Sequence, residues 1–478
     1  MSRSFTGRLR IGWLRWLAPA AAIVLGACAA PGVKSRAESK GFTPPVLAAA
    51  GALSESRGTK LIDSRLNTAP GAAANTDAED AHIRELIAAF RDQANAPLVA
   101  GNKIELLIDG PQTLAAIRRA IGAAKHHIHV ETYIFADDEV GREFRDLLIE
   151  RRRAGLEVRV IYDAVGSVTT PGAFFDAMRD AGVEVREFRP LDPVRTPLTW
   201  KLNNRDHRKI VVVDGTKAFT GGINISAAYA SASTSRPGPK AGVDEAWRDT
   251  HVEMDGPIAA QFQALFLSTW TRAGGEIAKN TQDSPDYFPQ IAPLGAELVA
   301  AVASDGDDQG ETAIYATYLT AIEHATQRIW LTNAYFAPNK ELRAALINAV
   351  KRGVDVRLIV PGFTDSGLIL HASRSTFDGL LSGGVRIFEQ RYALLHAKTA
   401  VIDTALSMVG SANLDMRSFL HNNEVNAVIV GSGFARKLEQ TFERDLKDTK
   451  EVKLAEWRKR PFTDKFKEFS SSLFGYFL

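Results

Sequence analysis

An internal repeat constrains the fold of this chain more than any other feature of its sequence. Residues 125–163 hold two apolar stretches separated by an amphipathic, helix-like segment, and residues 326–361 repeat this arrangement. Gly155 and Gly353 mark matching turns in the two copies, 198 positions apart. Apolar strands that alternate with amphipathic helices are typical of layered sheets covered by helices. We therefore predict an α/β protein with two similar domains packed about a pseudo-two-fold axis.

Each copy of the repeat leads to the same pattern of polar residues. Counted from a histidine, a lysine follows at +2, an aspartate at +7, a glycine at +14 and an asparagine at +17. The two sets are His207, Lys209, Asp214, Gly221, Asn224 and His396, Lys398, Asp403, Gly410, Asn413. Five matching positions at equivalent places in two repeats indicate a shared function rather than chance.

These residue types suit chemistry on a phosphodiester. A histidine and a lysine two positions apart on a strand point to the same face. Pairing of the two repeats then brings together two imidazoles, two ammonium groups and two amides. The ammonium groups and amides can bind phosphate oxygens. One imidazole can act as the nucleophile while the other acts first as acid and then as base.

The two motifs resemble the signature of the phospholipase D superfamily, a duplicated His-x-Lys-x4-Asp pattern, over about residues 100 to 450. Within it, the chain is most similar to bacterial cardiolipin synthases in the stretches GNKIELLIDG, ETYIFADDEVGREF, RDHRKIVVVDG, FTGGINIS, WRDTHVEMDGP, NAYFAP, LLHAKTAVID and GSANLDMRS. The resemblance implies two phospholipase D-like domains, each a mixed β-sheet flanked by helices. It also implies ping-pong phosphatidyl transfer between phospholipids, with phosphatidylglycerol as the expected substrate, through a phosphohistidine and without a metal or cofactor.

The resemblance further implies roles for single residues. His207 is expected to be the nucleophile and His396 the acid and base, with the reverse assignment left open. The residues expected to bind the substrate phosphate are Lys209, Lys398, Asn224, Asn413 and, as a further candidate, Ser411.

An acidic residue follows each motif in this family and orients an imidazole. The matching residues here are Asp249 and Glu424, and the sequence leaves open which of them serves which histidine. Asp214 and Asp403 complete the two catalytic motifs. We expect these two aspartates to stabilise the local fold rather than to touch substrate.

The N-terminus predicts where the protein is located. A basic stretch precedes an apolar run from Trp16 to Ala27, which is too short for a bilayer-spanning helix. The run ends in LGAC and so resembles a bacterial lipobox, which implies that Cys28 becomes a lipidated first residue. The expected location is the periplasmic side of the bacterial cell envelope, with the outer membrane favoured by Ala29. An uncleaved anchor with an incidental cysteine is the alternative.

The expected organisation follows from these features. A signal peptide (1–27) precedes a lipid-anchored spacer with a short helix (28–100). Two phospholipase D-like domains (101–285 and 286–450) form the body, and a C-terminal amphipathic tail (451–478) ends the chain. Apolar residues in this tail recur at helical spacing, namely Phe462, Phe466, Phe469 and Leu473. Docking on the body and contact with a membrane interface both remain open for this tail.

The amino-acid composition argues against several classes of function. Residues 28–478 hold 54 basic and 56 acidic residues, a formal net charge of −2. This balance and the lack of an aromatic–basic stripe argue against a nuclease or another nucleic-acid binder. One cysteine excludes a disulfide framework and any multi-cysteine metal site.

Two further alternative functions and two local features also need to be considered. A phospholipase D would pass the same intermediate to water, and a lipid-binding lipoprotein with a vestigial site would catalyse nothing. His127, His129 and Glu131 alternate on a strand, but no second ligand set accompanies them, so we predict no metal site there. Residues 231–243 are expected to form an extra loop near the first motif. Because both motifs lie in one chain, a monomer can in principle be active.

Overall fold

The structure, a computed structural model, describes most of the compact unit that begins at Ser39. The described residues are 77–93, 96–191, 203–233, 246–278, 281, 284–306, 312–364 and 366–473. Cys28 and its lipobox, the expected spacer up to residue 76, and residues 234–243 of the expected loop lie outside them. Within the described residues, no helix combines the length and the hydropathy needed to cross a membrane.

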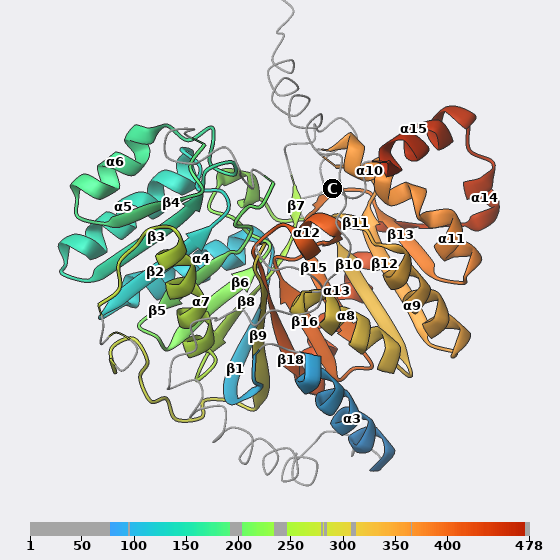
Figure 1. The fold of residues 1–478 in the computed structure, drawn as a ribbon, viewed down its shortest axis with the longest axis horizontal. Helices are drawn as coiled ribbons and strands as arrows, with labels where there is room; N and C mark the ends of the chain where they lie inside the picture. The colour runs from blue at the N-terminus through green and yellow to red at the C-terminus, as the bar shows by residue number, and fades with distance from the viewer. Residues whose placement is uncertain are drawn as a thin grey trace, which may run out of the picture. The chain divides into compact units, whose positions relative to one another are not determined.

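Fifteen strands of the described chain form one mixed sheet, which Figure 1 shows with its helices. The strands of the first half are β1 (Val99–Ile108), β2 (His127–Thr132), β3 (Glu157–Asp163), β4 (Glu184–Phe188), β5 (Ile210–Val213), β6 (Lys217–Gly221) and β8 (Thr250–Asp255). Those of the second half are β9 (Glu297–Ser304), β10 (Arg328–Asn333), β12 (Asp355–Pro361), β13 (Arg386–Gln390), β15 (Lys398–Ile402), β16 (Leu406–Gly410), β18 (Glu424–Val430) and β19 (Thr449–Val452). Two small parallel sheets pair β7 (Trp247–Arg248) with β14 (Leu394–Leu395) and β11 (Phe336–Ala337) with β17 (Leu414–Asp415).

Helices connect and cover these strands. In the first half they are α4 (Asp109–Ala123), α5 (Glu139–Arg153), α6 (Gly172–Asp180), the 3-10 turn η1 (Ala227–Tyr229) and α7 (Ala259–Arg272). In the second half they are α8 (Ala313–His324), α9 (Lys340–Lys351), α10 (Gly367–Ser375), α11 (Phe377–Ser382), α12 (Met416–Leu420), α13 (Ser432–Leu446), α14 (Leu454–Arg458) and α15 (Phe462–Ser472). The short helix predicted before the body is α3 (Asp77–Gln93), and its buried Ile87 and Phe90 join the core of the second half.

The strand order confirms the predicted pseudo-two-fold arrangement. Read outward from the centre, one half runs β1-β8-β6-β5-β2-β3-β4 and the other runs β9-β18-β16-β15-β10-β12-β13, so equivalent strands occupy equivalent places. The central strands β1 and β9 pair in antiparallel fashion only through their first residues, where the register shifts between Val99 and Asn102. The halves flank this junction in Figure 1. They therefore share one continuous sheet, to which β19 adds an outer strand.

Matching sequence features build matching elements in the two halves. Asp138 caps α5 and Asn339 caps α9, because each side chain accepts a hydrogen bond from a first-turn N–H. Gly155 and Gly353 then adopt φ angles of +98° and +94° in the turns that lead into β3 and β12. These angles lie in the region that glycine adopts without strain, which explains the glycine at both places.

Candidate active site

Two short pairings across the junction bring the motifs together. Asp206 forms a parallel bridge with Asn423, and β7 of the first half pairs with β14 of the second half. As a result, the backbone N–H of His207 donates to the carbonyl of Asn423 at 3.0 Å, and that of His396 donates to the carbonyl of Arg248 at 2.8 Å. Asn423 and Arg248 directly precede Glu424 and Asp249. Each motif histidine is therefore held beside the acidic residue of the other half.

The imidazole–carboxylate pairs are crossed between the halves, which answers a question that the sequence leaves open. Nδ1 of His207 lies 3.0 and 3.1 Å from the two carboxylate oxygens of Glu424. Nδ1 of His396 lies 2.7 Å from Oδ2 of Asp249. Because an ionised carboxylate only accepts hydrogen bonds, both Nδ1 atoms carry the proton. Nε2 of each ring is therefore the atom with a free lone pair.

Burial sets the charge state of these groups. Burial lowers the pKa of His207 to about 4, against the attraction of the Glu424 carboxylate. Burial also lowers the pKa of His396, and the Lys398 ammonium adds to the effect. Although burial opposes their ionisation, the facing imidazoles keep the pKa of Glu424 and that of Asp249 below their usual values. Both rings are thus neutral and both carboxylates are charged at neutral pH.

The two motif lysines are buried beside the rings. Nζ of Lys209 donates to the carbonyl of His207 at 2.6 Å, and Nζ of Lys398 donates to the carbonyl of His396. Burial lowers the pKa of Lys209 to about 7. The charge of Lys398 acts on the pKa of His207, and the charge of Lys209 acts on the pKa of His396. The four groups therefore form one site, in which a phosphate anion is strongly attracted.

The candidate phosphate-binding residues Asn224, Asn413 and Ser411 follow β6 and β16. Asn224 is engaged within the protein, since its Oδ1 accepts from the Ile134 N–H at 3.1 Å and its Nδ2 donates to the Tyr229 hydroxyl at 2.7 Å. Oδ1 of Asn413 is buried and has no hydrogen-bond partner among the described residues.

The Ser411 hydroxyl accepts from the Val425 N–H at 3.0 Å and also hydrogen-bonds Glu424, where it helps to lower that pKa. Ser418 and Asn422 hold the same carboxylate, with distances to Oε1 of 2.9 and 3.3 Å. In this geometry Ser411 supports a positioning residue. Its contact with substrate phosphate stays a prediction, as do those of Asn224 and Asn413.

The motif aspartates lie at the other ends of the motif strands. Asp214 accepts hydrogen bonds from the backbone N–H groups of residues 125–127, and Asp403 accepts them from those of residues 326–328. Both aspartates have a φ of 52° at a tight turn. These contacts fasten each motif hairpin to the start of β2 or β10. They favour the structural role that we expect for both residues.

Three aromatic residues pack around the rings and were not predicted from the sequence. The ring of Tyr133 stands edge-on to His207 at 5.0 Å between centroids, while Trp247 and Tyr229 lie 5.4 and 5.5 Å from His396. Tyr133 follows β2, and Trp247 lies two residues before Asp249. The sequence signal that could have identified them is their position close to the motif residues along the chain. These rings displace water from the imidazoles and so contribute to their lowered pKa values.

Two fully buried arginines join the halves behind the site. Arg208 Nε donates to the carbonyl of Glu424 at 3.1 Å, and its Nη2 lies 2.6 Å from Oδ1 of Asp305. Arg248 Nη2 lies 2.7 Å from Oδ2 of Asp445 on α13. Each arginine thus fixes a residue next to one imidazole–carboxylate pair to the opposite half.

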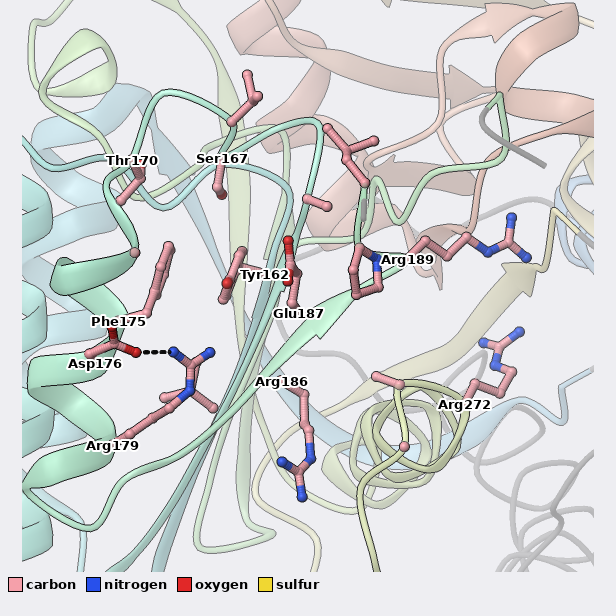
Figure 2. A pocket seen from close by; sticks show the side chains of 18 residues that line it. Tyr162, Ser167, Thr170, Phe175, Asp176, Arg179, Arg186, Glu187, Arg189 and Arg272 are labelled. Atoms are coloured by element: carbon pink, nitrogen blue, oxygen red, sulfur yellow. Dashed lines mark hydrogen bonds and ion pairs between the residues drawn. The ribbon is translucent and has the colours of Figure 1, made fainter. Parts of the chain in front are cut away.

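A pocket of about 1010 Å³ lies at the ends of β3 and β4 (Figure 2). Its lining includes four arginines, Arg179, Arg186, Arg189 and Arg272. Figure 2 shows Arg179 paired with Asp176, at 2.8 Å between Nη1 and Oδ1. At the same end of β3, Asp163 accepts the backbone N–H of Asp206 at 2.9 Å. The pocket therefore lies along the edge of the sheet that carries the first motif.

Comparisons with known proteins agree with this geometry. The family described as "Cardiolipin synthase, PLD-like domain" matches residues 117–234 and 318–446. Cardiolipin synthase 2 of Bacillus anthracis is 39% identical over 360 residues, which are 74% of this chain and 66% of that protein. Cardiolipin synthase 1 of Bacillus cereus is 35% identical over 382 residues, which are 79% of this chain and 72% of that protein.

A solved structure shows the same fold. The phosphatidylserine synthase of Haemophilus influenzae superposes with a TM-score of 0.61 at 15% sequence identity, covering 82% of this chain and 100% of that one. The matched family spans both motif-bearing halves, and relatives above 30% identity match most of the chain. The chain belongs to the cardiolipin synthase family of phospholipase D-like proteins.

Proposed function

We propose that this protein is a phosphatidyltransferase that makes cardiolipin from two phosphatidylglycerol molecules. The observation that carries the proposal is the crossed pairing of His207 with Glu424 and of His396 with Asp249 around two buried lysines. This arrangement offers a nucleophile, an acid–base group and phosphate-binding cations at one place. Relatives that are named cardiolipin synthases point to the same reaction.

The first half-reaction forms a covalent intermediate on His207. The lone pair of Nε2 attacks phosphorus, a P–N bond forms, and the P–O bond to the headgroup glycerol breaks. Binding of the anionic substrate raises the pKa of His396, so that its Nε2 takes up a proton from water and can then give it to the departing glycerol oxygen. Lys209 and Lys398 stabilise the charge that develops on the phosphoryl oxygens.

The second half-reaction reverses these roles. A hydroxyl group of the second phosphatidylglycerol gives its proton to Nε2 of His396 and attacks phosphorus. A P–O bond forms, the P–N bond breaks, and cardiolipin leaves. Glu424 and Asp249 hold Nδ1–H of each ring throughout, so that Nε2 stays directed at phosphorus.

Product analysis tests this proposal. The full chain is incubated with vesicles of labelled phosphatidylglycerol, and the lipid products are separated and identified by mass spectrometry. We expect cardiolipin and glycerol, and loss of both products in a His207→Ala variant. Phosphatidic acid in excess over cardiolipin would instead identify a hydrolase, and full activity of the variant would falsify the assignment of His207.

We also propose that Cys28 is lipidated and that it anchors the enzyme on the periplasmic side of the cell envelope. This proposal is supported by the sequence of residues 1–28, in which a basic stretch is followed by an apolar run that ends in the motif LGAC. Metabolic labelling with a radioactive fatty acid should mark the wild-type chain and leave a Cys28→Ser variant unlabelled. Equal labelling of both chains, or of neither, would contradict this anchor.

A further inference from the structure

The C-terminal helix α15 exposes its apolar side. Phe462 is 78% exposed and Phe469 is 62% exposed, and Phe466 and Leu473 are also mostly exposed. The residues that this helix buries are polar, since Glu468 is only 6% exposed and pairs with Arg460. The helix packs through this polar side on α10, beside which it lies in Figure 1. A helix in this orientation needs a partner for its apolar face.

Other exposed apolar residues lie at the strand ends of both halves where the two motifs meet. We call this the site edge, where β2, β3, β4, β10, β12 and β13 end and where the motif strands β5 and β15 begin. Large exposed apolar residues that follow β3, β4, β12 and β13 are Val168, Leu191, Leu368 in the first turn of α10, and Tyr392. These four residues follow equivalent strands in the two halves. They therefore lie at the strand ends next to which the motif strands begin.

Helix α15 belongs to this same edge. A pocket between α15 and the body is lined by Ala337 at the end of β11, by Pro338 after it, and by Met416, which lies three residues after Asn413. Lys465 and Phe469 of α15 line it as well. By contrast, Leu294 is 55% exposed at the opposite edge, where its N–H bonds the carbonyl of Gly101 at the start of β1.

The charges around α15 indicate what kind of surface its apolar face binds. Residues 453–473 hold six basic and three acidic residues, a net charge of +3, although the body as a whole is slightly acidic. Lys459, Lys465 and Lys467 are exposed. Aromatic side chains flanked by lysines are typical of helices that lie in the interface of an anionic bilayer. The last five residues, FGYFL, continue this apolar character in the sequence.

We propose that the site edge rests on an anionic bilayer and that the apolar face of α15 inserts into its interface. This inference rests on the proposed function, because phosphatidylglycerol is both the substrate and the anionic lipid. It adds an orientation, in which the active-site mouth meets the headgroups and the opposite edge points away. A substrate lipid then reaches the two imidazoles without leaving the membrane entirely.

A fluorescent probe in the full chain tests this orientation without turnover. A Phe469→Cys variant is labelled with a polarity-sensitive fluorophore, and a matched Leu294→Cys variant reports on the opposite edge. The parent chain, whose one cysteine is Cys28, gives the background. We expect phosphatidylglycerol vesicles to shift the emission of the label at position 469 to shorter wavelength and to leave the label at position 294 unchanged. Phosphatidylcholine vesicles should produce a smaller shift.

Two outcomes of this measurement would overturn the proposal. If both labels respond alike, or if neither responds, the site edge does not face the bilayer. If the label at position 469 shifts without vesicles, and more so at higher protein concentration, a second copy of the chain covers α15 instead. A clear shift in a protein that makes no cardiolipin would leave this orientation standing and reject only the proposed function.

Measurement of enzyme activity provides a second test of membrane insertion. Replacing Phe466 and Phe469 with serine removes two side chains from the interface, and each is expected to cost about tenfold in activity on vesicles. Dissolved short-chain phosphatidylglycerol needs no interface, so the loss there should be much smaller. The matched control is Leu294→Ser, which should keep its activity in both formats. An equal loss of the double variant in both formats would contradict membrane insertion.

Discussion

At the scale of single residues, each imidazole depends on a carboxylate from the other half. In Glu424→Gln and Asp249→Asn the size of the side chain is kept, but the charge that holds Nδ1–H is lost. We expect each change to lower the turnover rate by about 100-fold or more, because the ring is no longer held in the reactive tautomer. Initial rates on saturating lipid measure the effect. Glu253→Gln, which alters an ion pair with Lys217 away from the site, is the control.

The roles of the two histidines can also be separated. If His207 is the nucleophile, a His396→Asn variant should still form the phosphohistidine slowly but should fail to pass it on. A phosphatidyl adduct on the peptide that holds His207 should therefore accumulate and be found by mass spectrometry. An adduct on His396 in a His207→Asn variant would establish the reverse assignment.

Buried neutral histidines make the stability of the fold depend on pH. Burial lowers the pKa of His207 to about 4, and lowers those of His127 and His251 to about 3. In the unfolded chain these rings take up protons near pH 6.5. Because the unfolded state then binds more protons, the free energy of unfolding falls as the pH drops from about 6.5 towards 4. The depressed pKa values of Glu424 and Asp249 act in the same direction.

Denaturant unfolding at pH 7 and pH 5 measures this dependence. Each such histidine should cost about 2 kcal/mol at pH 5 relative to pH 7. A His127→Phe variant keeps an aromatic ring against Tyr287 and removes one titrating group, so it should recover about that amount. An unchanged difference between the two pH values in this variant would contradict the mechanism.

At the scale of elements, the motif hairpins are fastened by their aspartates. Asp403→Ala leaves three backbone N–H groups without their acceptor and places alanine at a φ of 52°, so we expect a loss of about 2–4 kcal/mol in unfolding free energy. Asp403→Asn tolerates this backbone conformation and keeps one acceptor oxygen, so its loss should be smaller. Calorimetry compares the two variants. A larger loss in the asparagine variant would contradict the structural role.

The elements of the repeats were predictable because they depend on local patterns. Apolar strands, capped helices and the turns at Gly155 and Gly353 each follow from a few neighbouring residues. The direction of α15 was not predictable in this way. Its sequence shows an apolar face, but the residues that the helix buries are the polar Glu468 and Ser471.

The assignment of the carboxylates also lay beyond the sequence. It depends on the pairing of Asp206 with Asn423, which lie 217 positions apart and form only one bridge. Such long-range contacts leave no local periodicity to read. The aromatic residues Tyr133, Tyr229 and Trp247 were missed for the same reason, since their positions near the rings result from the packing of both halves.

At the scale of the whole molecule, a buried ion pair joins the two halves next to the active site. Arg248 pairs with Asp445 across the junction, while its carbonyl accepts the N–H groups of His396 and Ala397. Arg248→Ala leaves the Asp445 carboxylate buried without its counter-ion. The expected loss is about 3–5 kcal/mol of unfolding free energy, together with activity, because the segment between β14 and β15 that carries His396 loses its support.

A double variant separates the charge from the packing. Replacing Arg248 with methionine and Asp445 with leucine removes this ion pair and fills most of the space, so the double variant should be more stable than Arg248→Ala. Asp109, 3.5 Å from Nη1 of Arg248, loses its partner in both variants, so the comparison isolates the effect of Asp445. Denaturant unfolding of the three chains measures this order, and activity on vesicles shows whether packing alone can hold His396 in place. If Arg248→Ala is as stable as the double variant, the cost does not come from the unpaired Asp445 carboxylate, and the junction does not depend on this ion pair. If the order is as expected, the two halves are kept in register by charges that lie directly behind the reacting rings. Folding of the junction and assembly of the active site are then the same event.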